Sequence, residues 1–141
     1  MILYQNSLMV LDYSPATDIL TVDWPNAPLY LLPEIKYALQ MLVENVKNYD
    51  IKFLLIDAGK TITNHELMDS PEYKEMVTQF SLDLNTTRLK KSARIISLDN
   101  SREEKTQELT RNLTQTIQFN YQFQSFTSRE EAINWLMLNN I

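Results

Sequence analysis

Asp57, Gly59, Lys60 and Thr61 directly follow an apolar segment, residues 51–56, and are the residues best placed to do chemistry. A carboxylate, an ammonium group and a hydroxyl on one turn could contact a ligand or the polar surface of a partner. The string Gly59-Lys60-Thr61 has the residue types that end a phosphate-binding P-loop. That loop also needs a glycine five residues before Gly59, where this chain has Leu54. We therefore expect no P-loop here.

Asp99 follows a second apolar segment, residues 93–98, much as Asp57 follows the first. In open α/β sheets, ligands bind at the carboxyl ends of parallel strands, so two neighbouring carboxylates could share a Mg²⁺ ion. Such sites usually use more oxygen ligands than two, and the residues after Asp99 are typical of a turn and helix cap. We expect partner or ligand contacts from Asp57, Gly59, Lys60, Thr61 and Asp99, with no metal and no other cofactor.

The stretch around Asp57 resembles the first motif of haloacid-dehalogenase phosphatases. The resemblance implies a nucleophilic Asp57 and phosphoryl contacts from Thr61. The second aspartate of that motif, the acid/base, is replaced by Gly59. A nucleophile without its proton partner is a poor catalyst, so we predict no catalytic residue. The alternative is structural: Asp57 accepts hydrogen bonds from turn amides, and Gly59 supplies an unusual backbone angle.

The composition excludes several kinds of site. The chain has no cysteine, which excludes disulfides and thiolate chemistry, and its single histidine, His65, excludes multi-histidine metal sites. We expect His65 to be exposed in a polar loop. A net charge of -5 disfavours nucleic acid as a partner. Without an 18-residue apolar run or a signal peptide, the chain is expected to be cytoplasmic and not to span a membrane.

The hydrophobic patterns predict a single α/β domain over residues 1–141, with a mixed five-stranded sheet, an N-terminal β-hairpin and four helices in the order ββαβαβαβα. The expected strands cover residues 8–13, 19–24, 51–57, 93–99 and 119–126. The first expected helix covers residues 33–49, and the second begins at residue 71 and closes at the basic residues 88–91. The third covers residues 101 to about 116, and a short terminal helix follows Ser128, with its apolar residues at 132–137. Helical spacing puts the apolar residues of the first helix on one stripe: Ile35, Ala38, Leu39, Leu42, Val43 and Val46.

Local signals predict where the helices begin and end. Ser70 is expected to cap the second helix, and Ser101 and Ser128 each start a capping box. A basic cluster is expected to close the second helix at its negative end. The sharper alternative for this cluster is an anionic headgroup or phosphate site. Its members are Arg88, Lys90, Lys91 and Arg94.

The order of elements resembles SpoIIAA-like STAS domains, also described as STAS/Sec14-like. The resemblance covers nearly the whole chain, from the hairpin ending in Val22-Asp23-Trp24 to the closing segment 130–136. It implies a small α/β domain that binds and does not catalyse. The phosphorylatable serine of many STAS proteins corresponds here to Ala58, so the chain lacks the residue on which that phosphorylation switch depends.

Three functions remain open from the sequence. The first is a regulatory or scaffolding module that binds a protein partner through residues 60–80. The second is a carrier of a small apolar or lipid-like ligand, with Met41, Met76, Phe80 and Trp135 able to line a pocket. The third is a degenerate phosphatase of the haloacid-dehalogenase type. The uncharged segment 119–126 is also expected to form an edge strand, and this favours a homodimer.

Overall fold

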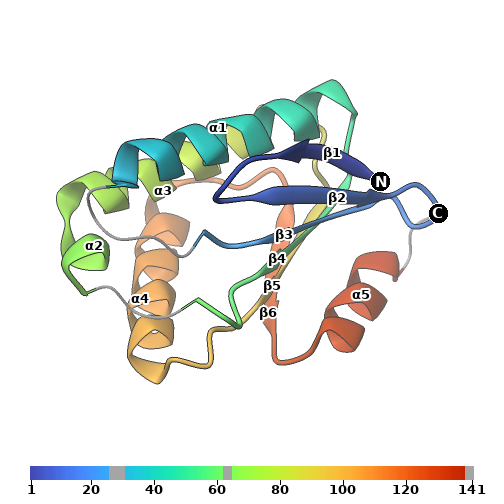
Figure 1. Cartoon of the computed structure of the whole chain (residues 1–141). Coiled ribbons are helices and arrows are strands. Elements are labelled where there is room, and N and C mark those ends of the chain that lie inside the picture. Colours follow the sequence, from blue (N-terminus) through green and yellow to red (C-terminus); the bar gives the residue numbers. More distant parts are fainter. Residues whose placement is uncertain (26–30, 62–64, 139–141) are drawn as a thin grey trace.

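The computed structural model describes residues 1–25, 31–61 and 65–138, and these form a single α/β domain built on one mixed sheet (Figure 1). This confirms the predicted class. The described residues contain six strands and five helices, one of each more than predicted. The additions are β1 (Ile2–Gln5) and the short helix α2 (His65–Asp69), which lies where the sequence predicts a polar loop. Residues 62–64 of that loop and the side chain of His65 lie outside the description.

The first three strands form an antiparallel meander at one edge of the sheet. β1 pairs with β2 (Val10–Ser14), which pairs with β3 (Ile19–Asp23). In the turn between β2 and β3, Asp18 has a φ of 59°, and its carboxylate accepts a 2.7 Å hydrogen bond from the Tyr13 hydroxyl. β1 escapes prediction because its sequence, ILYQ, has no regular alternation of apolar and polar residues.

The other three strands extend the sheet in parallel from β3. They are β4 (Phe53–Asp57), β5 (Lys91–Ile95) and β6 (Gln122–Phe126). The order across the sheet, from β1 to β6, is also the order along the chain.

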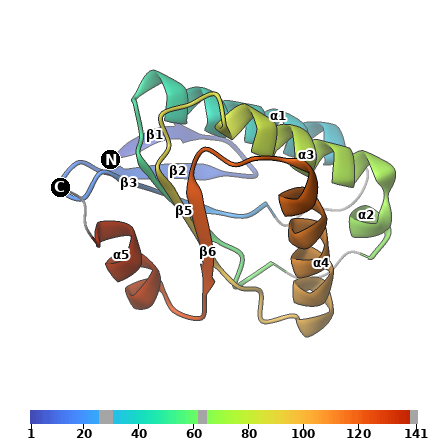
Figure 2. The ribbon, with the colours of Figure 1, turned by 180° about the vertical axis from the view of Figure 1, so that it is seen from behind.

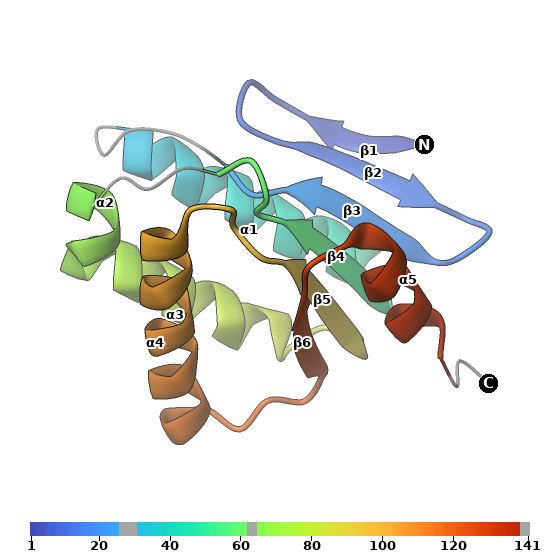
Figure 3. The same ribbon diagram turned by 90° about the horizontal axis from the view of Figure 1, so that it is seen from below.

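The helices lie on two faces of this sheet. Figures 2 and 3 show the helices that connect parallel strands on one face and the last helix on the other. A sequential parallel sheet has this arrangement because right-handed crossovers all place their helices on the same side. The connecting helices are α1 (Leu32–Asn48), α3 (Pro71–Leu84) and α4 (Asn100–Thr116), and the last is α5 (Arg129–Met137).

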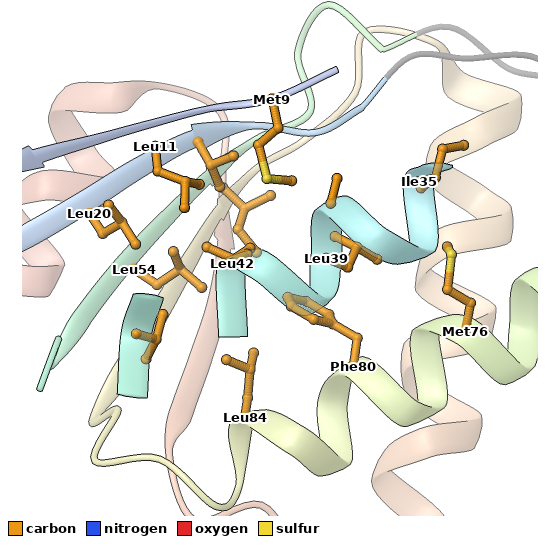
Figure 4. Close-up of a cluster of buried hydrophobic side chains, with 14 of the residues drawn as sticks. Met9, Leu11, Leu20, Ile35, Leu39, Leu42, Leu54, Met76, Phe80 and Leu84 are labelled. Carbon is orange, nitrogen blue, oxygen red and sulfur yellow. The ribbon is translucent and has the colours of Figure 1, made fainter. Parts of the chain in front are cut away.

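The larger core lies between the sheet and helices α1 and α3 (Figure 4). Leu39 and Leu42 of α1 meet Leu20 of β3 and Leu54 of β4, and each is at most 2% exposed. The predicted stripe of α1 is confirmed, except that Val43 is only partly buried. Complete burial of a leucine side chain contributes about 2 kcal/mol, so this layer is the main source of stability.

A smaller core lies on the opposite face, under α5. β4 serves both cores because successive side chains of a strand point to opposite faces: Leu54 faces α1, whereas Phe53 and Leu55 face α5. Ala132 and Leu136 are the fully buried residues of α5 in this cluster. β4 is therefore buried on both faces, as its apolar sequence predicts.

Two of the three predicted helix caps are confirmed. The Ser70 hydroxyl accepts a hydrogen bond from the Tyr73 amide at 3.1 Å, and the Ser128 hydroxyl accepts one from the Glu131 amide at 3.2 Å. The predicted cap at Ser101 is wrong. α4 begins one residue earlier, with Asp99 as its cap, because the Asp99 carboxylate accepts from the amide three residues on.

Several boundaries also differ from the prediction. α3 ends at Leu84, so the basic cluster does not close it, and Lys91 instead opens β5. β5 ends at Ile95, four residues before Asp99, and β6 begins only at Gln122. No helix among the described residues is both long enough and apolar enough to cross a membrane.

Candidate functional site

The carboxylate of Asp57, at the end of β4, is already engaged by other groups of the protein. One oxygen accepts a 2.8 Å hydrogen bond from the Gly59 amide, and the other contacts Nε and Nη2 of Arg129 at 3.1 and 3.0 Å. Arg129 also reaches Asp23 at 3.4 Å, so it connects the ends of β3 and β4 to the start of α5. As a nucleophile, Asp57 would have to release this arginine.

The predicted unusual backbone angle of Gly59 is wrong, because this glycine does not have a positive φ. The reason for a glycine here is space. A Cβ atom at position 59 would lie 3.0 Å from the Asp57 carboxylate oxygen that accepts the Gly59 amide. A side chain would therefore displace the carboxylate.

Thr61 and Lys60 differ in their exposure. Thr61 is only 4% exposed, and its hydroxyl donates to the Trp24 carbonyl at 3.3 Å. Its own carbonyl accepts a 2.8 Å hydrogen bond from the Ser97 hydroxyl, which joins the loops after β4 and β5. Thr61 is thus a structural residue in this conformation, whereas Lys60 is exposed.

Asp57 and Asp99 belong to opposite faces of the sheet, so they do not form the pair that a shared Mg²⁺ ion would need. Asp57 has the same orientation as Phe53 and Leu55 and contacts α5, whereas Asp99 caps α4 on the other face. Residues 1–25, 31–61 and 65–138 contain no cluster of three or more potential metal-binding side chains.

The predicted basic cluster is divided among different partners. Arg88 lies 3.7 Å from Asp50, and Lys91 donates to the carbonyls of Trp135 and Leu138 at 2.9 and 2.7 Å. Arg94 points to the other face of the sheet, into the region between β5 and α4. These cations do not converge on one anion site.

A cavity of about 150 Å³ lies between α3, α4 and strands β4 to β6. It opens beside β6, where the lining residues Phe123 and Ser125 are exposed. Most of its wall is apolar. The apolar wall comprises Trp24, Ile56, Ala58, Tyr73, Val77, Phe80, Leu84, Leu109, Leu113, Phe119, Tyr121 and Phe123.

The aromatic part of this wall is ordered by ring contacts. Phe119 packs edge-to-face on Tyr121 and Phe123, with centroid distances of 5.5 and 5.0 Å. Trp24 and Phe80 form a similar pair at 6.1 Å. Burial raises the pKa of Tyr121 to about 12, because a phenolate would be poorly solvated there.

Arg94 lines the cavity and forms an ion pair with Glu103. Two hydrogen bonds, of 2.9 and 2.5 Å, join the guanidinium to the carboxylate, which also accepts from the Ser97 amide at 3.1 Å and from Gln107 at 3.2 Å. Burial acts to raise the pKa of Glu103, but Arg94 and the other donors outweigh it and hold the pKa below its ordinary value.

Arg102 and Thr106 also line the cavity, and each has a buried polar atom without a partner in the described structure. Arg102 is 4% exposed; its Nη1 lies 3.3 Å from the sulfur of Met68, and its Nε has no hydrogen bond. The Thr106 hydroxyl oxygen is likewise unsatisfied. Such atoms are uncommon in folded proteins, and a bound water, ion or ligand group can satisfy them.

Of the four residues predicted to line a pocket, Phe80 lines this cavity, and Met41, Met76 and Trp135 do not. Met76 packs in the larger core, and Trp135 lies on the opposite face against Phe126. The sequence feature that could have predicted this cavity is the residue pattern of α4. Arg102, Thr106, Leu109, Thr110 and Leu113 follow helical spacing, so the polar helix has one face that is partly apolar.

Comparison of the chain with models of protein families, with curated proteins and with solved structures finds no match. A function must therefore be inferred from the cavity and the groups around it.

Proposed function

We propose that this protein is a cytoplasmic, non-catalytic binding module that takes a small apolar ligand into the cavity between α3, α4 and strands β4 to β6. The observation that carries this proposal is the cavity itself, with a volume of about 150 Å³ and a mainly apolar wall. An engineered apolar cavity of about this size binds benzene, so roughly six to ten non-hydrogen atoms fit. The resemblance to STAS/Sec14-like domains, which implies binding, is in line with this proposal.

The surroundings of Asp57 and Thr61, the residues that a phosphatase would need, support a binding role. The Asp57 carboxylate is held by Arg129 and the Gly59 amide, and the Thr61 hydroxyl by the Trp24 carbonyl. These contacts fix the side chains within the fold. The phosphatase alternative needs both groups to be directed at a substrate.

The proposal is tested by titrating the protein with benzene and monitoring the NMR signals of the leucine methyl groups. The expected result is saturable shifts at Leu84 and Leu113, which line the cavity, with a Kd between about 10 μM and 1 mM for so small a ligand. Leu109→Phe should block the shifts, because the larger ring fills the cavity. Leu82→Phe is the matched control, since Leu82 lies on the exposed side of α3. Equal, non-saturating shifts in both variants would contradict the proposal.

Native mass spectrometry of the freshly purified protein provides a second test. A reproducible extra mass that is lost on denaturation would support a carrier and give the mass of the ligand. The Leu109→Phe variant should not retain that mass, whereas the Leu82→Phe control should. Retention by both variants would place the ligand elsewhere.

A second candidate function is protein binding through residues 60–80. Lys60 and Glu72 are exposed, and the outer side of α3 faces solvent. Charge reversal at either residue should weaken binding of a protein partner and leave the benzene titration unchanged. Pulled-down partners that are the same for both variants and the original protein would count against it.

A homodimer through β6 is a further proposal about assembly. Within the described structure β6 pairs on one side only, with β5, and residues 122–125 are uncharged and exposed. Such an edge can pair with a second copy. Sedimentation equilibrium should show a dimer that Ser125→Pro converts to a monomer. The backbone groups of Gln122 and Phe126 bond to the β5 side, so the N–H of Ser125 faces the open edge, and proline there cannot donate to a strand ladder. A monomer before substitution would end this proposal.

A further inference from the structure

Arg102 is a buried cation without a carboxylate partner in the described structure. Its side chain is 4% exposed, and its only side-chain hydrogen bond there goes from Nη1 to the weakly accepting sulfur of Met68. A buried guanidinium is normally paired, because the loss of hydration is otherwise uncompensated. The site is thus short of one negative charge.

Thr106 adds a second unsatisfied group to the same place. It lies one helical turn after Arg102, so the two side chains share a face of α4. Its hydroxyl oxygen is buried without a partner in the described structure, like Nε of Arg102. Both residues line the cavity, and together they offer N–H and O–H donors to an occupant.

The charge of the expected occupant follows from the other arginine. Among the described residues that line the cavity, the charged ones are Arg94 and Arg102. Arg94 is neutralised by Glu103, so a single positive charge remains. One charge matches a monoanion, and the planar fork of a guanidinium matches the two oxygens of a carboxylate.

The orientation of the occupant follows from the order of residues on α4. Arg102 and Thr106 lie near the start of the helix, whereas Leu109 and Leu113 lie toward its end, close to the aromatic wall. We propose that the ligand is a small monocarboxylic acid with an apolar tail. Its carboxylate binds Arg102 and Thr106, and its tail extends toward Leu113 and Tyr121. This inference rests on the proposed function, because it names the ligand class of the same cavity.

The test compares three probes of similar shape, each with at most about ten non-hydrogen atoms: phenylacetate, 2-phenylacetamide and propylbenzene. Binding is followed by calorimetry, and by fluorescence of Trp24 in a Trp135→Phe variant, since Trp24 lines the cavity and Trp135 does not. Charge-assisted hydrogen bonds make the acid the expected tightest ligand, by about 10- to 100-fold over the amide.

Variants then locate the carboxylate. Arg102→Met should abolish the preference for the acid while propylbenzene still binds, and Thr106→Val should reduce the preference several-fold. Arg111→Met is the matched control, because Arg111 is an exposed arginine of the same helix. Arg102→Met removes a buried unpaired charge, so it should not unfold the protein. If Arg102→Met does unfold the protein, the Thr106→Val variant decides: an unchanged preference for the acid would contradict the inference.

Each outcome separates the two proposals. If all three probes bind equally, or propylbenzene binds tightest, the carboxylate inference is wrong and the apolar cavity stands. If Arg111→Met loses the preference as Arg102→Met does, the effect is one of net charge, and the inference is also wrong. If none of the probes binds, the proposed function itself fails.

Discussion

Arg94 near the end of β5 and Glu103 in the first turn of α4 meet through two hydrogen bonds of 2.9 and 2.5 Å. The pair joins the sheet to the helix that forms one wall of the cavity. Glu103 also accepts from the Ser97 amide in the connection between them. The position of α4, and therefore the shape of the cavity, depends on this contact.

Removing either partner should destabilise the fold by different amounts. Arg94→Ala leaves a buried carboxylate without its cation and should cost about 3–5 kcal/mol of unfolding free energy. Glu103→Gln keeps a neutral acceptor for the Ser97 amide and should cost less, about 1–2 kcal/mol. Urea denaturation at pH 7 measures both. A double variant that equals the sum of the singles would show that the pair is not coupled.

The same carboxylate should make stability depend on acid pH. Since the folded pKa of Glu103 is held below its ordinary value of 4.5, its stabilising effect is complete above that value. The effect is lost as the pH falls through the folded pKa. The stability gap between the original protein and Glu103→Gln should therefore be constant from pH 7 to 5 and shrink below pH 4. A gap that is unchanged at pH 3 would contradict this.

Tyr121 should control stability at alkaline pH. Its pKa is about 12 in the fold and about 10 in the unfolded chain, so the folded state keeps a proton that the unfolded state loses. The contribution is complete below pH 10 and falls by about 1.4 kcal/mol per pH unit between pH 10 and 12. Tyr121→Phe should lack this loss, and its stability relative to the original protein should rise across that window. If the stabilities of the original protein and of Tyr121→Phe change in parallel between pH 10 and 12, the effect is ruled out.

Gly59→Ala should weaken the contact between β4 and α5. The new Cβ would lie 3.0 Å from the Asp57 oxygen, so the carboxylate must move and its bonds to the Gly59 amide and Arg129 lengthen. We expect a loss of about 1–2 kcal/mol in thermal unfolding. Arg129→Ala removes the other half of the contact. If Gly59→Ala lowers the stability of the Arg129→Ala variant as much as it lowers that of the original protein, the effect does not pass through the contact with Arg129, and the mechanism is wrong.

At position 50, glycine should be a more stable replacement for Asp50 than alanine. Its φ is 51°, in the left-handed region, and its only described ion pair is an exposed contact with Arg88 at 3.7 Å. Asp50→Gly relieves the backbone strain and should exceed Asp50→Ala in stability by about 1 kcal/mol. Both substitutions remove the same charge, so their difference isolates the backbone. Equal melting temperatures would indicate no strain.

The sequence predicts those elements whose apolar residues repeat regularly. The stripe of α1, the buried strand β4 and the caps Ser70 and Ser128 all depend on neighbours within a few positions, and all are confirmed. β1 and α2 are too short to produce a regular pattern. The boundary of α3 shifts because a run of cations has several structural uses besides ending a helix.

The candidate site is much less predictable than the fold. Arg129 reaches Asp57 across 72 positions, and the burial of Arg102 depends on how α4 packs over the sheet. On a helix as polar as α4, a buried arginine has the same sequence signature as an exposed one. Asp57 and Asp99 illustrate the same limit: the ends of neighbouring strands are predictable, but the face on which each side chain lies is not.

The sequential order of the strands has a consequence for synthesis on the ribosome. Each strand after the first pairs with one made before it, so the sheet can grow in step with translation. The α1 face can close early, since its helix precedes β4. The other face stays uncovered until residues 129–137 emerge, and until then Phe53 and Leu55 present bare apolar surface. In a nascent chain, this is the surface that a chaperone would meet.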